Sequence, residues 1–244
     1  MASELDTRTM DRRPPAATLI STFRHGDARD LCGDPLNGVL KNSPTFADGA
    51  ISIQNSGASV TSSTLIGVEY PIATKTTKDW QLISISFWIY PENEGNGGIY
   101  GKRPPVIMMY SSANSYASWS GHWTCTLQSA GKLWFVRRYS NNEKDWYVNG
   151  SAYTLNAWQH IAMTMDCTTN TTKFYKNGTL MTTTNFYVGV PGIINGGCEI
   201  RLGSQFFTAT ANDGFDGQLS KLMIWEGKIL TQSEVTEIYS QGRT

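Results

Sequence analysis

The chain has 244 residues, of which 40% are hydrophobic and only 16% are charged, and 20 basic residues balance 20 acidic ones. The zero net charge disfavours nucleic acid and anionic membrane surfaces as partners. No run of about 18 apolar residues occurs, so we predict no transmembrane helix. A chain of this length that is rich in Ser, Thr and Asn is typical of one large β-sandwich domain.

The cysteines are widely spaced and form no Cys-x-x-Cys pair, which argues against zinc and thioredoxin-type chemistry. Three disulfide pairings are open to four cysteines, but free buried thiols are the expectation for a chain made in a cytoplasm. The four are Cys32, Cys125, Cys167 and Cys198.

Residues 1–15 are predicted to form an extended arm, and residues 16–244 a single domain. The arm balances three acids with three arginines, ends on Pro14-Pro15 and lacks the apolar core of a signal peptide. We therefore expect synthesis in a cytoplasm; a secreted protein that has lost its signal is the alternative. The arm holds too few apolar side chains to fold alone, so we expect it to lie across a neighbouring subunit or another protein.

Short alternating segments between Gly- and Asn-rich loops predict an all-β chain. Trp88, Trp158 and Trp225 fall within or beside these segments and are predicted to be core residues. Asn177-Gly178 is the strongest turn signal and predicts a type I′ hairpin. The predicted strands cover 17–23, 50–53, 58–60, 84–90, 106–110, 123–127, 132–139, 199–203 and 219–225.

The last stretch reads as a strand followed by a short helix. Simple alternation puts Leu219 on one face of the strand with Lys221, Met223 and Trp225, and the residues between them on the other. Thr231-Gln-Ser-Glu234 has the pattern of a capping box, which predicts a helix starting near Thr231. Leu230 and Val235 would form the hydrophobic staple, and Gly242 would close the helix.

These C-terminal elements resemble the signature of laminin G-like domains in the concanavalin A-like lectin/glucanase superfamily. The resemblance covers roughly residues 16–244 and includes Phe215-Asp-Gly217, Trp158-Gln-His-Ile-Ala162, Tyr175-Lys-Asn-Gly178 and Ser86-Phe-Trp-Ile89. It implies a jelly roll of two antiparallel sheets with one short C-terminal helix. The fold hosts lectins, enzymes and structural modules, so it does not imply a function.

Enzymatic activity is not expected. Related glucanases use a Glu-x-Asp-x-x-Glu strand that places two glutamates on one face, and this pattern is missing here. His160 occupies the family's Trp-x-His position, where a hydrogen-bonded structural histidine is expected. A Gly-x-Ser-x-Gly nucleophile turn is also missing. We predict no hydrolysis of β-glucans.

Aromatic residues in the middle loops are candidates for stacking on sugar rings, because Arg and Asn side chains accompany them. Plugging a sandwich edge or meeting a neighbouring subunit is the alternative role for such aromatics. The candidate carbohydrate-binding residues are Tyr116, Trp119, His122, Trp123, Arg138, Asn141 and Trp146.

Calcium is the one candidate cofactor, since the resemblance includes domains that hold this ion through loop carboxylates. Asp48, Asp213 and Asp216 lie near Gly-rich turns and are the candidate ligands. Aspartates that cap turns are the alternative interpretation.

Two functions of different class are open. The first is a structural or decoration protein of a virion, such as a bacteriophage capsid or tail, made in the host cytoplasm and displaying a lectin-like jelly roll that binds host glycans. This reading reconciles a laminin G-like domain with the lack of a signal peptide. The second is a free-standing carbohydrate-binding lectin module, located outside the cell. Copies of the chain or other virion proteins, and glycans, are the expected partners.

Overall fold

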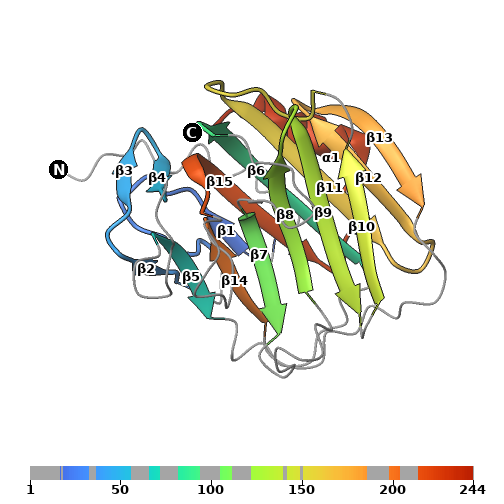
Figure 1. Cartoon of the computed structure of the whole chain (residues 1–244), viewed down its shortest axis with the longest axis horizontal. Helices are drawn as coiled ribbons and strands as arrows, with labels where there is room; N and C mark the ends of the chain where they lie inside the picture. The colour runs from blue at the N-terminus through green and yellow to red at the C-terminus, as the bar shows by residue number, and fades with distance from the viewer. Residues whose placement is uncertain are drawn as a thin grey trace.

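Two antiparallel β-sheets face each other, and one short helix covers the outer face of one of them (Figure 1). This confirms the predicted all-β sandwich with a C-terminal helix. The predicted arm, 1–15, lies outside the described residues. The computed structural model describes residues 17, 19–32, 37–55, 66–71, 82–93, 105–111, 122–139, 142–148, 151–185, 198–203 and 214–243.

The larger sheet contains eight of the described strands in the order β13-β12-β11-β6-β15-β4-β3, with β1 paired to β15. These strands come from both ends and from the middle of the chain. They are β1 (Leu19–Ser21), β3 (Thr45–Ala47), β4 (Ala50–Gln54), β6 (Leu82–Pro91), β11 (Gln159–Asp166), β12 (Thr171–Lys176), β13 (Thr179–Asn185) and β15 (Asp216–Glu226).

The second sheet contains seven of the described strands in the order β10-β9-β8-β7-β14-β5-β2. The consecutive strands β7 to β10 form one side of this sheet, and β14, β5 and β2 from other parts of the chain form the other side. The strands are β2 (Val39–Lys41), β5 (Gly67–Pro71), β7 (Pro105–Ser111), β8 (His122–Gln128), β9 (Lys132–Tyr139), β10 (Asn142–Val148) and β14 (Cys198–Leu202).

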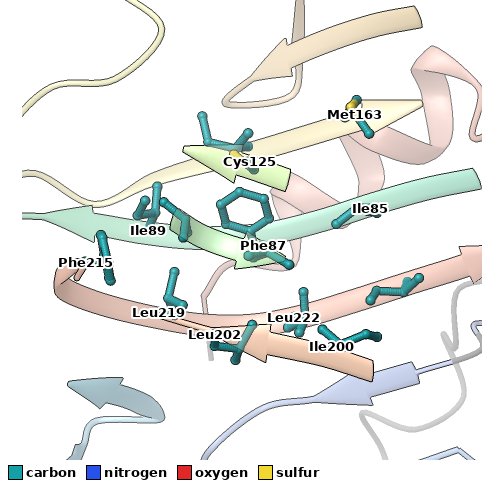
Figure 2. Packing of buried hydrophobic residues seen from close by; sticks show 14 of the residues in the cluster. Ile85, Phe87, Ile89, Cys125, Met163, Ile200, Leu202, Phe215, Leu219 and Leu222 are labelled. Carbon is teal, nitrogen blue, oxygen red and sulfur yellow. The ribbon is translucent and has the colours of Figure 1, made fainter. Parts of the chain in front are cut away.

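The hydrophobic core fills the space between the two sheets (Figure 2). Alternate residues of β6 supply Ile85, Phe87 and Ile89, all at most 2% exposed. Phe135 from β9 meets Phe174 from β12 across the interface, with ring centroids 4.7 Å apart. Because both sheets contribute apolar side chains at every second position, burial of these side chains provides the main force that holds the sandwich together.

The strand β15 departs from simple alternation. Its register shifts between Ser220 and Met223, and Lys221 adopts a positive φ of 47°. As a result Leu219 faces the core with Leu222, and the prediction that it shares a face with Met223 is wrong. The bulge lies where the pairing along one edge of β15 changes from β4 to β1. The extra residue there changes which face of the sheet the following side chains point to.

Several local predictions are confirmed, and others are corrected. Asn177 and Gly178 both have positive φ and join β12 to β13, as expected for a type I′ hairpin. The first predicted strand is reduced to the three residues of β1, and the predicted strand 58–60 lies outside the described residues. Cys125 is a buried free thiol, as expected, whereas Cys32 and Cys167 are only half-buried.

The helix α1 (Gln232–Ser240) begins at the predicted capping box. The Glu234 amide donates to the Thr231 hydroxyl at 3.3 Å, and the Thr231 amide donates to the Glu234 carboxylate at 2.7 Å. Leu230 and Val235 are both buried and pack in one cluster, as the staple requires. The Gly242 amide, at a positive φ, donates to a carbonyl of the last turn. This helix, the one found in the described part of the chain, is too short and polar to span a membrane.

The capping box makes a prediction about stability. Replacing Thr231 with alanine removes the acceptor for the Glu234 amide and is expected to cost about 1 kcal/mol of unfolding free energy. Urea denaturation followed by circular dichroism measures this loss. Ser233, exposed in the first turn, provides the control, because Ser233→Ala leaves the cap intact. Equal stability of Thr231→Ala and the parent protein would show that the cap contributes nothing.

The outer face of the eight-stranded sheet is covered only in part. Trp225, at 0% exposed, packs in a second cluster with the helix residues Val235 and Ile238. Trp88 and Trp158, however, are only half-buried, so the prediction that they belong to the core is wrong. Whether a tryptophan on this face of the sheet is buried depends on which part of the face the helix covers. That is decided by tertiary packing and cannot be read from the alternation of residues along a strand.

Candidate functional site

One end of the seven-stranded sheet gathers the segments that carry the predicted sugar-binding residues. The register places the last residues of β5, β7 and β9 beside the first residues of β14, β8 and β10. The segments 112–121 and 140–141 connect strands whose ends lie here. Strand ends of one sheet are therefore the common anchor for most of the candidate residues.

The register brings His122 and Arg138 together as directly opposed residues of β8 and β9. Trp123 is the next residue and is paired with Arg137. Opposed positions of an antiparallel pair lie about 5 Å apart, so these residues form a compact group of backbone positions at the sheet end. Sequence spacing alone does not reveal this, since 16 positions separate His122 from Arg138 along the chain.

The remaining candidates divide into two kinds. Trp146 is paired with Phe135, three positions along β9 from Arg138, so the structure does not group it with His122 at the sheet end. Tyr116, Trp119 and Asn141 lie outside the described residues, and their predicted role stays a prediction.

A row of charged residues crosses the outer face of the same sheet, and the sequence analysis missed it. The Glu69 carboxylate of β5 lies 3.2 Å from Lys41 Nζ of β2 and 3.3 Å from Arg201 Nη2 of β14. The side chains of Glu69 and Arg201 are 23% and 21% exposed. Each lies between two buried apolar residues in its strand, and that alternation is the signal that marks an outward-facing charge.

Close to this row, the outer face holds polar and aromatic groups that are nearly covered. Thr124 and Thr126 of β8 alternate with the core residues Cys125 and Leu127, yet they are only 9% and 3% exposed. Trp134, opposed to Thr126, is 6% exposed. This indole is therefore no exposed stacking platform, although its place near the middle loops suggests one.

The carboxylates do not form a hydrolytic pair among the side chains that the structure describes. On the seven-stranded sheet, Glu69 is the one acid whose side chain is described, and two cations hold its carboxylate. The glucanase arrangement needs a second carboxyl about 5–10 Å away. No group of three His, Cys, Asp or Glu that could hold a metal occurs in the described part of the chain.

The candidate calcium ligands do not come together where the structure describes them. Asp48 lies in the turn before β4, and Asp216 is paired with Gln54 at the other end of that strand. Ala50 and Gln54 are four positions apart along the strand, about 13 Å, so the two carboxylates cannot share an ion. Asp213 lies outside the described residues.

Asp216 has a structural role instead. It is 4% exposed, and its carboxylate accepts from the Asn55 amide and from the Asn93 side chain, each at 2.5 Å. The backbone carbonyl of Asp216 accepts from Glu92. The alternative interpretation, an aspartate that caps a turn, describes this residue better than that of a metal ligand.

His160 is a buried structural histidine. Its Nε2 lies 2.7 Å from the Ser86 hydroxyl, and both residues are 0% exposed. Burial, and next the charge of Lys221, lower the pKa of His160 to about 4. The ring is therefore neutral at pH 7, and no substrate reaches the Ser–His contact. The predicted structural role is confirmed.

Comparison with known proteins defines the class of this domain. A family model of laminin G type, described as the concanavalin A-like lectin/glucanases superfamily, matches residues 67–236. The chain belongs to this superfamily. No match was found among curated protein sequences.

Solved structures show the same fold at low sequence identity. Domain 4 of AbnA, a GH43 extracellular arabinanase from Geobacillus stearothermophilus solved in complex with arabinotriose, has a TM-score of 0.63 and 19% identity. The match covers 91% of this chain and 98% of that one. The botulinum neurotoxin serotype G binding domain has a TM-score of 0.68 and 16% identity.

The botulinum neurotoxin DC binding domain, in complex with SialylT, has a TM-score of 0.66 and 16% identity. The two neurotoxin matches cover 93% and 94% of this chain but only 51% and 52% of the neurotoxin chains. This chain thus spans about half the length of those binding domains. At such low sequence identities the similarity establishes only the fold. This fold is a lectin-like jelly roll, and it is similar to modules that were solved with bound oligosaccharides.

Proposed function

We propose that the protein is a non-catalytic, lectin-like module that binds oligosaccharides on the seven-stranded sheet. The observation that carries the proposal is the opposed pairing of His122 and Arg138 at the sheet end. Both are hydrogen-bonding residue types suited to sugar hydroxyls, and the sequence predicts sugar binding for both. The lectin-like fold supports the proposal, because the strand order brings the ends of six strands of one sheet together there.

The extent of the site favours an oligosaccharide over a single sugar. Arg201 lies two strands from β8 across the sheet, about 10 Å. It also lies two residues further from the sheet end than His122, about 7 Å along the strands. Polar groups at both places can contact successive units of one extended ligand. Glu69 holds Arg201 and Lys41 in place, which reduces the entropy that these side chains lose on binding.

The environment of Glu69 supports a binding role without catalysis. Two cations hold the Glu69 carboxylate, and no second carboxyl among the described side chains of this sheet completes the pair that hydrolysis needs. We separately propose that residues 1–15 attach the domain to a virion or to another assembly. Location in a virion, or alternatively outside a cell, also stays a proposal.

The double variant His122→Ala/Arg138→Ala tests the proposal. Glycan-array screening first identifies a bound oligosaccharide, with arabinotriose included as a calorimetric probe. We expect the double variant to bind this ligand at least about tenfold more weakly, because each lost charge-assisted or neutral hydrogen bond is worth about 1 kcal/mol or more. Reducing sugar should not be released from laminarin or lichenan.

Lys132→Ala is the matched control, because Lys132 lies on β9 at the opposite end of the same sheet. This control should keep the affinity of the parent protein. The proposal fails if the parent protein binds no glycan on the array, or if the double variant and the control bind equally well. Release of sugar above that of a heat-killed sample would contradict the non-catalytic part.

A further inference from the structure

A second group of half-exposed aromatic residues lies on the opposite side of the molecule, on the outer face of the eight-stranded sheet. It extends from the end of α1 across β6 and β11 to the residues that follow the helix. None of these residues was predicted to bind a ligand. The outer aromatic patch consists of Trp88, Tyr90, Trp158, Lys221, Tyr239 and Arg243, each of them half-buried.

The rings form two neighbouring pairs. Trp88 stacks on Tyr239 of the helix with ring centroids 5.6 Å apart and an interplanar angle of 23°. Tyr90 meets Trp158 at 5.7 Å and 52°. Trp88 and Tyr90 are two positions apart on β6, about 7 Å. Ring faces repeat along this strand, so a ligand with more than one ring can contact both pairs.

Two cations are held among these rings. The Arg243 guanidinium lies 4.5 Å from the centroid of the Trp158 ring, and its Nη1 donates to the Asp48 carbonyl at 2.7 Å. Lys221 Nζ donates to the Gly242 carbonyl at 3.1 Å. The Ser220 hydroxyl donates to the Arg243 carbonyl at 3.1 Å, which fixes the chain after the helix over β15.

The contacts that the structure shows for the two cations of the patch are all to neutral groups. The partners of Lys221 and Arg243 are backbone carbonyls, an amide oxygen and an indole ring, and neither cation makes an ion pair with a residue that the structure describes. Burial, and then the charge of Arg24, lower the pKa of Lys221. A bound anion would relieve this repulsion, because an opposite charge favours the protonated amine.

We infer that the outer aromatic patch is a second saccharide site that selects acidic sugars, with the rings contacting sugar faces and Arg243 and Lys221 binding the sugar carboxylate. This inference rests on the proposed function, since it assigns a ligand class to a second face of the same module. Arg243 is well suited to the role, because its planar guanidinium can donate two parallel hydrogen bonds to a carboxylate.

The mixture of rings and cations identifies the occupant. An apolar protein surface or a lipid tail would cover Lys221 and Arg243 without pairing their charges, which is unfavourable. A neutral sugar would contact the rings but leave both charges as they are. An acidic sugar supplies C–H faces for the rings and a carboxylate for the cations, so it complements both features.

Titration calorimetry of the full chain tests the inference with matched pairs of probes. Trigalacturonate and sialyllactose are the acidic probes, and galactotriose and lactose are their neutral partners. We expect an acidic probe to bind more tightly than its neutral partner, and this difference to shrink as the salt concentration rises. Arg243→Ala should weaken the acidic probe about tenfold and leave the neutral one unchanged.

Two further variants make the result specific. Lys173→Ala removes one positive charge from β12 of the same sheet, outside the patch, and should keep acidic binding within about twofold of the parent protein. Trp158→Leu should weaken acidic binding by removing a ring face. If that variant fails to fold, Arg243→Ala, which changes a half-buried residue beyond the helix, still decides the matter.

The double variant His122→Ala/Arg138→Ala separates this inference from the proposed function. Acidic binding that persists in the double variant and is lost in Arg243→Ala supports two sites. Acidic binding lost only in the double variant overturns the second site and supports the first. Equal affinity for acidic and neutral probes, an equal loss in Lys173→Ala, or binding to phosphatidylserine vesicles without binding to either acidic probe would also overturn it.

Discussion

Replacing Asn55 with alanine is expected to lower the free energy of unfolding by about 4 kcal/mol, because several buried backbone groups lose their partner at about 1–3 kcal/mol each. The Asn55 side chain donates to the carbonyls of Ile66, Gly203 and Phe215 and accepts from the Ile66 amide, at 3.0–3.4 Å. Asn55 itself is 7% exposed, so water does not replace these contacts.

The position of Asn55 explains why the effect should be large. Asn55 and Phe215 flank strands of the eight-stranded sheet, whereas Ile66 and Gly203 flank strands of the seven-stranded sheet. One amide side chain therefore joins the two layers at the end opposite the candidate sugar site. Alanine also leaves a small cavity, which adds to the loss.

Guanidinium denaturation followed by tryptophan fluorescence measures this prediction. Gln54→Ala is the matched control, because Gln54 precedes Asn55 and its side chain is exposed, where it donates to the Glu92 carboxylate. We expect the control to change stability by less than about 0.5 kcal/mol. A loss in Asn55→Ala no larger than that in the control would show that the sheets are joined by apolar packing alone.

Gly217→Ala is expected to be the most damaging single substitution, with a loss above about 4 kcal/mol or failure to fold. Gly217 has φ of 146°, and a Cβ atom there would lie 2.2 Å from the Tyr90 carbonyl oxygen and 2.7 Å from the Phe215 ring. The contact with Tyr90 is to backbone in the neighbouring strand, so a side-chain rotation cannot relieve it. The strands β6 and β15 would have to separate.

Gly227→Ala is the control for backbone conformation without crowding. Gly227 also has a positive φ, 73°, but nothing lies within 4 Å of the Cβ that alanine would add. We expect a loss of only about 1 kcal/mol, the cost of a left-handed conformation in an L-residue. Soluble yield and thermal unfolding compare the two variants. Similar losses at both positions would mean that conformation, and not the clash at Gly217, sets the cost.

This clash also explains why the Phe-x-Gly pattern at 215–217 identifies the fold. The pattern marks a strand that approaches its neighbour closely, and the observed backbone of β15 shows that approach. The capping box at Thr231 is different, since a cap acts within one turn of chain and all its interacting atoms are near one another in the sequence. The need for glycine at 217 comes instead from Tyr90 in a strand that is distant in the chain, so only the family resemblance made that pattern recognisable.

Alternation failed as a predictor at two places, and for the same reason. In β15 the bulge at Lys221 shifts the side chains, and this bulge occurs where β4 and β1 succeed each other along the strand. On β6, Trp88 occupies an alternating strand position but stays half-exposed where the cover by α1 ends. Both outcomes depend on neighbouring elements that are distant in sequence.

The sequence by itself determined the sandwich class, several of the strands, the helix cap and the type I′ hairpin, because local backbone preferences and hydrophobic periodicity encode them. Short strands such as β2, β3 and β5 were missed. It also supplied the residue types of the candidate sugar site. Only the tertiary structure decided which of these residues meet. The strand register opposes His122 to Arg138 and places Trp146 elsewhere. The sheet order forms the Glu69–Arg201 contact, and the chain beyond α1 places Arg243 over Trp158. The contacts of Glu69 with Arg201 and of Arg243 with Trp158 join distant parts of the chain, so they follow from the packing of the whole sandwich and not from any single segment. The pairing of His122 with Arg138 follows from the register of the β8–β9 hairpin.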